Sequence, residues 1–104
     1  MVFYCNTCGK ELTVDEGTLS WRDDENCVRE FRITHKHDQG HACDQKDIGY
    51  VHLWIVTGIS GLVKFNEMLS DYWAKGYSLK DPGGLKEALS QIGSYIWEKT
   101  KNQA

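Results

Sequence analysis

Two cysteines separated by two residues stand almost at the start of this chain, in YCNTCGKEL (residues 4–12), and a glycine follows the second one. Two thiolates one short turn apart can reach the same ion, and the glycine permits a backbone turn that a side chain would resist. A redox pair of this spacing sits instead where a strand runs into a helix. Because the following KELTVDEGTLSW reads as turn and strand, the pattern favours a metal-binding turn.

The segment THKHDQGHACD (residues 34–44) offers further ligands, since it holds three of the four histidines and one cysteine. Loops that only face solvent have little reason to be so rich in imidazole, whereas a tetrahedral Cys/His site has an obvious one. The two clusters together predict a zinc site.

Strand alternation indicates which histidine binds. In CVREFRITHK (residues 27–36), a two-residue period gives one face to five residues: Cys27, Arg29, Phe31, Ile33 and His35. Since Phe31 and Ile33 should face the core, His35 should also point inward, at the end of the strand.

Cys43 is the cysteine of the loop, and thiolate is the preferred ligand of structural zinc. The predicted ligand set is Cys5, Cys8, His35 and Cys43. His37 is the first alternative for the histidine position and His41 the second. Cys27 precedes the inward part of the strand, so we expect it to pack as a small apolar residue or to lie exposed.

Composition places these clusters in a small, mildly acidic chain of 104 residues with a net charge of -3. The start of the chain lacks the basic and apolar regions of a secretory signal. The longest apolar stretch, YVHLWIVTGISGLV (residues 50–63), is interrupted by polar residues and glycines and is too short to span a membrane. We therefore expect a cytoplasmic protein with reduced thiols, which disfavours disulfides.

The periodicity predicts an α+β fold in a single domain, residues 1–104. Strands in GTLSW and VREFRIT, with RDDEN as the turn between them, form an antiparallel hairpin within a zinc-ribbon-like part, residues 1–48. An antiparallel helix pair occupies residues 49–100, and residues 101–104 form a frayed tail.

The expected helices have recognisable ends. Ser60 caps the first, whose apolar residues recur at helical spacing, and Gly76 ends it. Asp81 caps the second and Pro82 takes its first position. Before them, YVHLWIVTG (residues 50–58) fits a short strand or a helical turn, and the turn is preferred.

A family resemblance follows from the order of these features. YCNTCGKEL, a hairpin strand ending in FRITHK, then a cysteine and a helix opening with GISGL resemble small uncharacterised bacterial and phage proteins with a zinc-ribbon-like N-terminal part. The resemblance covers about the first two-thirds of the chain. It implies the ligands Cys5, Cys8, His35 and Cys43, and it implies no known activity.

The predicted donor set argues against catalysis, because a Cys-rich set fills all four positions and leaves none for water. The sharpest enzymatic alternative is a histidine-metal nuclease of the HNH type. Such a site needs an Asn and a further His on the following helix. Asn66 is present, but no histidine follows His52.

Binding functions therefore remain, and no catalytic residue is predicted. A zinc-ribbon protein that binds nucleic acid is one alternative, with basic residues along the hairpin and Trp21 or Phe31 for stacking; these basic residues are Arg22, Arg29, Arg32 and Lys36. Neighbouring acidic residues offset them, so a protein partner or self-association is preferred. The predicted interface aromatics are Trp54, Tyr95 and Trp97.

Overall fold

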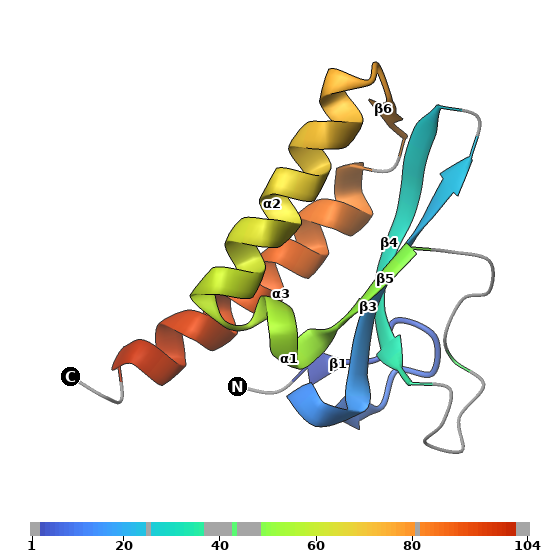
Figure 1. Cartoon of the computed structure of the whole chain (residues 1–104). Coiled ribbons are helices and arrows are strands. Elements are labelled where there is room, and N and C mark those ends of the chain that lie inside the picture. Colours follow the sequence, from blue (N-terminus) through green and yellow to red (C-terminus); the bar gives the residue numbers. More distant parts are fainter. Residues whose placement is uncertain (1–2, 25, 37–42, 44–48, 81, 102–104) are drawn as a thin grey trace.

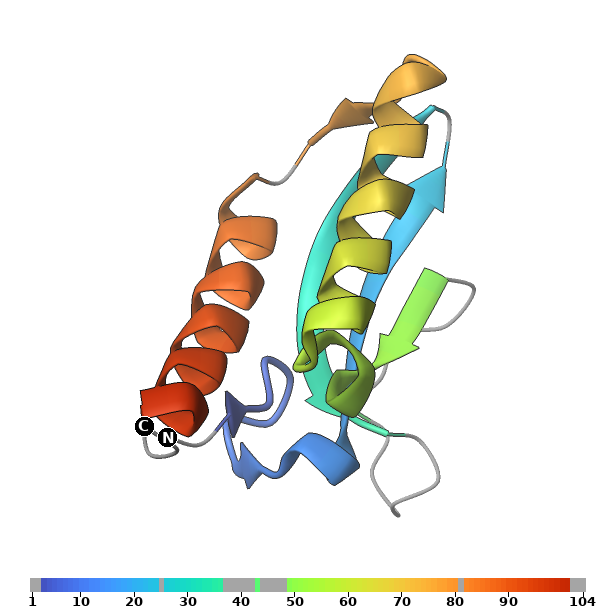
Figure 2. The same cartoon turned by 60° about the vertical axis from the view of Figure 1, so that its left-hand side comes forward.

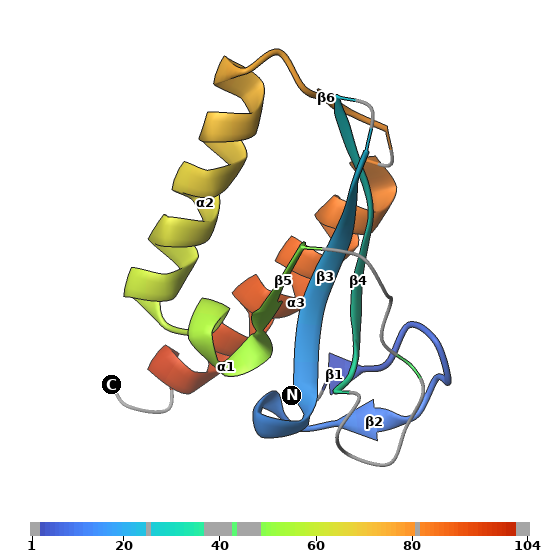
Figure 3. The same ribbon diagram turned by 45° about the vertical axis from the view of Figure 1, so that its right-hand side comes forward.

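The computed structural model describes residues 3–24, 26–36, 43, 49–80 and 82–101. Helices cover one face of a four-stranded sheet, and a small two-stranded unit stands at one end of this sheet (Figures 1 and 3). The α+β class and the order of a hairpin followed by helices are confirmed.

The elements follow one another in this order: β1 (Phe3–Tyr4), β2 (Glu11–Leu12), the 3₁₀ turn η1 (Val14–Glu16), β3 (Gly17–Asp24), β4 (Cys27–His35), β5 (Gly49–His52), α1 (Leu53–Val56), α2 (Ile59–Ala74), β6 (Ser78–Leu79) and α3 (Pro82–Lys101). Strands β1 and β2 pair with each other. The larger sheet has the order β5-β3-β4-β6, in which β3 is antiparallel to both neighbours and β6 is parallel to β4.

A bulge interrupts the hairpin and corrects the predicted alternation of β4. The β3–β4 register shifts by one residue at Glu30, whose φ is 56°. Val28 and Phe31 are therefore both buried, while Arg29 is exposed. The prediction that Arg29 shares the core face was wrong, because the extra residue reverses the alternation before Phe31. His35 lies beyond the bulge and is buried, as expected.

Helix α2 begins after Gly58, so the prediction that Ser60 caps it was wrong. The short helix α1 turns directly into α2: the Gly58 N–H donates to the Ile55 carbonyl, and the Leu62 N–H donates to the Gly58 carbonyl. This reversal starts α2 earlier than a side-chain cap would. The helix ends before Gly76, whose φ of 86° lies in the left-handed region that glycine tolerates.

Strand β3 runs on to Asp24, so the first three residues of the predicted turn RDDEN belong to the strand. Helix α3 starts at Pro82, while its predicted cap, Asp81, lies outside the described residues. The stretch at residues 50–58 contains both the short strand and the helical turn that were weighed for it, since β5 ends at His52 and α1 follows at once.

Both long helices pack on the same face of the sheet and run in opposite directions (Figure 2). Phe65 of α2 contacts Trp21 and Phe31, with ring centroids 5.8 and 6.4 Å apart. Helix α3 lies along β4. The two-stranded unit joins the same core, because Phe3 is buried and its ring lies 5.3 Å from that of Tyr95.

The two halves of the chain are interlocked. Residues 49–52 and 78–79, within the part expected to be helical, add strands to both sides of the hairpin. Lys101 is the last residue of α3, and residues 102–104 of the predicted tail lie outside the described residues. No helix in the described part of the chain combines the length and the apolar character needed to cross a bilayer.

Gly61 permits the close packing of α1 on α2. A Cβ at this position would lie 2.0 Å from the Ile55 carbonyl oxygen. We expect Gly61→Ala to lower the free energy of unfolding by about 2–3 kcal/mol, because the backbone must shift to relieve the overlap. Denaturant titration followed by circular dichroism measures the change.

Gly93→Ala is the matched control, because Gly93 is also helical and nothing lies within 4 Å of the added Cβ. It should raise the free energy of unfolding by about 0.5–1 kcal/mol through helix propensity. Equal effects of the two substitutions would contradict the packing argument.

Candidate metal centre

The four residues predicted as ligands come together at one end of the sheet. The ligand atoms of Cys5, Cys8, His35 and Cys43 all lie within 4.8 Å of one another. The Cys8 Sγ is 3.5 Å from the His35 Nδ1. In a tetrahedral zinc site, bond lengths of about 2.3 Å to sulfur and 2.0–2.1 Å to nitrogen imply an S···N edge of about 3.6 Å. The group therefore has the dimensions of a site that could hold a metal ion.

The Cys5–Cys8 turn is built by backbone hydrogen bonds. The Gly9 N–H donates to the Cys5 carbonyl and the Cys5 N–H donates to the Lys10 carbonyl, each over 2.9 Å. Gly9 has a φ of 78°, which explains the glycine after the second cysteine. The N–H groups of Thr7 and Cys8 point at the Cys5 Sγ, at 3.4 and 3.5 Å. These donors favour a thiolate at Cys5.

Two side chains inside the turn attach it to the other ligands. Asn6 bonds to Ile33 twice: the Asn6 N–H donates to the Ile33 carbonyl over 2.7 Å, and the Asn6 Oδ1 accepts from the Ile33 N–H over 2.8 Å. This places the turn beside the end of β4, two residues before His35. The Thr7 hydroxyl donates to the Cys43 carbonyl over 2.8 Å. Neither Asn6 nor Thr7 was predicted from the sequence to support the site, although polar side chains between two cysteines indicate such a role.

Burial differs among the four ligands. Cys5 and His35 are 1% and 3% exposed, Cys43 is partly buried and Cys8 is exposed. His35 is the last residue of β4 and faces Gly17 of β3. The centre therefore lies at the end of the hairpin, with two ligands in the core and one towards solvent.

The pKa values of Cys5 and Cys43 shift in opposite directions. Burial opposes ionisation of Cys5, but hydrogen bonds from the backbone N–H groups of Cys8, His35 and Thr7 outweigh it and lower the pKa to about 6. Burial raises the pKa of Cys43 to about 11, together with its hydrogen bonds to Cys5 and Cys8 and their negative charge. A divalent cation would offset this repulsion and hold all three as thiolates.

Of the remaining ligand candidates, His37 and His41 lie outside the described residues. Cys27 is buried at the opposite end of β4, where it pairs with Ser78 of β6. The nuclease layout gains no support, since the Asn66 amide donates to the Leu62 carbonyl of its own helix.

The residues predicted to contact a protein partner or a nucleic-acid base differ in their exposure. Trp54 and Trp97 are exposed by 53% and 67%, while Tyr95 is partly buried against Phe3. Trp21 is buried in the core, so it is not accessible for stacking on a base. Phe31 is 2% exposed and is closed to a base in the same way.

Three sulfurs and one imidazole nitrogen form a Cys-rich donor set that could hold a metal ion. Such sets hold an ion structurally, whereas catalytic ions keep a position for water and use histidine or carboxylate ligands. Comparisons of the chain with protein-family models, curated protein sequences and solved structures find no match. The chemistry of the site therefore rests on its own geometry.

We expect Cys8→Ser to lower zinc affinity by at least a hundredfold, because a hydroxyl is a poor substitute for a thiolate. Competition with a chromophoric chelator measures the affinity, and cobalt substitution reports the thiolate ligands by their absorption. Cys27→Ser is the matched control, since it also removes a thiol but lies outside the cluster. Equal losses in both variants would contradict the assignment.

Metal affinity should rise with pH. Because Cys43 retains its proton up to about pH 11 in the metal-free protein and Cys5 loses its proton near pH 6, binding near neutral pH must release at least the Cys43 proton. We expect the affinity to increase about tenfold or more for each pH unit between roughly 6.5 and 8.5. Chelator competition at three pH values measures the slope, and an affinity independent of pH would rule out this protonation scheme.

Proposed function

We propose that the chain is a non-catalytic, cytoplasmic zinc-binding protein, in which a structural metal centre of zinc-ribbon-like form holds together a small interaction module. The observation that carries the proposal is the closed group of three sulfurs and one imidazole nitrogen within 4.8 Å of one another. Such a group leaves no coordination position for a substrate.

The donor atoms support zinc as the ion. Thiolate and imidazole ligands in a tetrahedral arrangement suit zinc, whereas magnesium and calcium take oxygen ligands and higher coordination numbers. All four cysteines are free. A site that needs three reduced thiols fits a reducing compartment, which supports a cytoplasmic location.

The packing around the centre supports a structural role. Phe3, Cys5 and Leu12 of the two-stranded unit are buried, yet this unit has only two residues in each strand. An isolated hairpin of this size is not stable in water. An ion bound by Cys5, Cys8 and residues outside the unit would fix it against the sheet, so that binding energy becomes folding energy.

The exposed apolar residues support a protein partner or self-association. Ile59 and Val63 are 76% and 50% exposed, and they lie one turn apart on α2. Trp97 of α3 is also exposed, and large aromatic residues are common anchors of interfaces. Tyr95 extends the core beside Phe3, so among the predicted interface residues Trp54 and Trp97 are the stronger candidates.

Elemental analysis and thiol counting test the proposal on protein purified without a histidine tag. We expect one zinc per chain, and we expect three ligand thiols and the buried Cys27 to react slowly until the protein unfolds. Removal of the ion with a chelator should broaden or shift the amide signals of residues 3–12 and of the end of β4, while α2 keeps its helical signal.

Re-addition of zinc should restore the spectrum, and magnesium serves as the control ion. Protein that contains no zinc when purified under reducing conditions, or a spectrum unchanged by the chelator, would refute a structural zinc centre.

A further inference from the structure

The face of the sheet turned away from the helices carries an ordered set of side chains. Leu19 pairs with Val51 on the helical side, so the residues that flank Leu19 on β3 point to the opposite side. We call this the outer face. Its cross-strand rows, from β4 through β3 to β5, are Thr34, Thr18 and His52, then Arg32, Ser20 and Tyr50, and beyond the bulge Arg29 beside Arg22.

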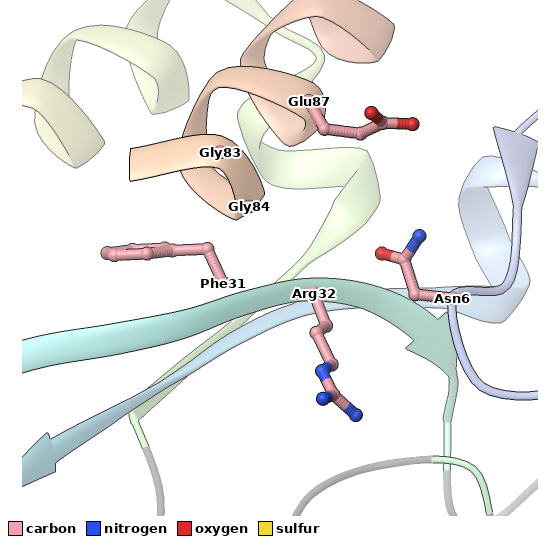
Figure 4. Close-up of a pocket in the computed structure, with 6 residues that line it drawn as sticks. All are labelled: Asn6, Phe31, Arg32, Gly83, Gly84 and Glu87. Carbon is pink, nitrogen blue, oxygen red and sulfur yellow. The ribbon is translucent and has the colours of Figure 1, made fainter. Parts of the chain in front are cut away.

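Thr18, Ser20 and Thr34 in the middle of the outer face are buried, and the charged side chains around them are mainly basic, although the chain as a whole has a charge of -3. Arg29 and Arg32 are exposed, and Arg22 pairs with Glu30. Figure 4 shows Arg32 pointing away from α3, on the side of β4 opposite Gly83, Gly84 and Glu87, which line a groove with Phe31 and Asn6. The three arginines thus lie on two neighbouring strands, β3 and β4, whose backbones are about 5 Å apart.

Aromatic rings line the β5 edge of the same face. The His52 ring lies parallel to that of Trp54, with centroids 6.5 Å apart and an interplanar angle of 8°, and Tyr50 meets His52 edge-on at 5.8 Å. Tyr50 and Trp54 are exposed by 62% and 53%. Of these two accessible rings, Tyr50 lies in the same cross-strand row as Arg32, and Trp54 lies beyond His52.

We propose that the exposed side chains of the outer face bind single-stranded nucleic acid, with unpaired bases stacked on Tyr50 and Trp54 and phosphates paired with Arg29 and Arg32. Stacking on aromatic side chains beside a basic surface is how single strands are held without base-specific contacts. A duplex would hide the faces of its bases from these two rings. The helices, which could otherwise contact a duplex, lie on the other side of the sheet. An acidic peptide would pair with the arginines but would leave the two exposed rings without planar partners.

This inference goes beyond the proposed function, because it assigns a partner to a surface that contains no metal ligand. Its test therefore uses zinc-loaded protein, and metal content is measured separately for each variant. If the protein does not bind the oligonucleotide, the measured zinc content still stands. If it contains no zinc, the measured oligonucleotide binding still stands.

Fluorescence anisotropy with a labelled twelve-nucleotide oligothymidylate gives the affinity. We expect binding that weakens on the order of tenfold between 50 and 200 mM salt, as for two or three phosphate contacts to a single strand. Arg29→Gln and Arg32→Gln should each weaken binding several-fold and reduce the salt dependence. Lys99→Gln, which makes the same change of charge on α3, should leave both unchanged.

Trp54→Ala should weaken binding about tenfold through the loss of one stacked base. Trp97→Ala removes an even more exposed tryptophan from α3 and should have no effect. Three results would overturn the proposal: no binding at 50 mM salt, equal losses in the two tryptophan variants, or equally tight binding of duplex DNA or polyglutamate. The last result would assign the face to a duplex or an acidic protein.

Discussion

The convergence of three cysteine sulfurs and one imidazole is the constraint on which the N-terminal part of this protein depends. Their ligand atoms lie within 4.8 Å of one another, a spacing that a cation would stabilise once the thiols ionise. The four residues come from the first turn of the chain, from the end of β4 and from Cys43 beyond it. A cation bound between them would reinforce the attachment of the N-terminal unit to the end of the sheet.

The backbone prepares this meeting before any ion binds. The paired hydrogen bonds between Asn6 and Ile33 align the cysteine turn with β4, and the hydroxyl of Thr7 fixes the carbonyl of Cys43. Phe3 anchors the same unit in the core against Tyr95. A site positioned in this way loses little freedom when it binds its ion, as a structural centre requires.

Much of this arrangement could be predicted from the sequence, and the failures have local causes. The alternation that selected His35 is uninterrupted from Phe31 onward. It failed at Arg29 because Glu30 adopts a left-handed conformation, and a bulge formed without glycine leaves no clear mark in a sequence. The clustered cysteines and histidines identified the centre. The role of Asn6 could not be predicted, because Asn6 bonds to a strand whose position relative to the cysteine turn was unknown from the sequence.

Tertiary partners determined the elements that periodicity could not predict. Strands β5 and β6 are too short to show a pattern and exist because β3 and β4 offer free edges. The early start of α2 depends on its contact with α1 at Gly61 rather than on a cap. These features follow from packing between distant segments, which local propensity does not contain.

The separation of the ligands along the chain gives the centre an effect on the unfolded state. An ion that joins Cys5 to His35 closes a long loop, and a covalent link of that span would remove chain entropy worth about 3–4 kcal/mol. A disulfide would need an oxidising environment to do the same. A zinc ion bound at the centre would provide such a cross-link under reducing conditions, and the strength of this cross-link would follow the supply of free metal.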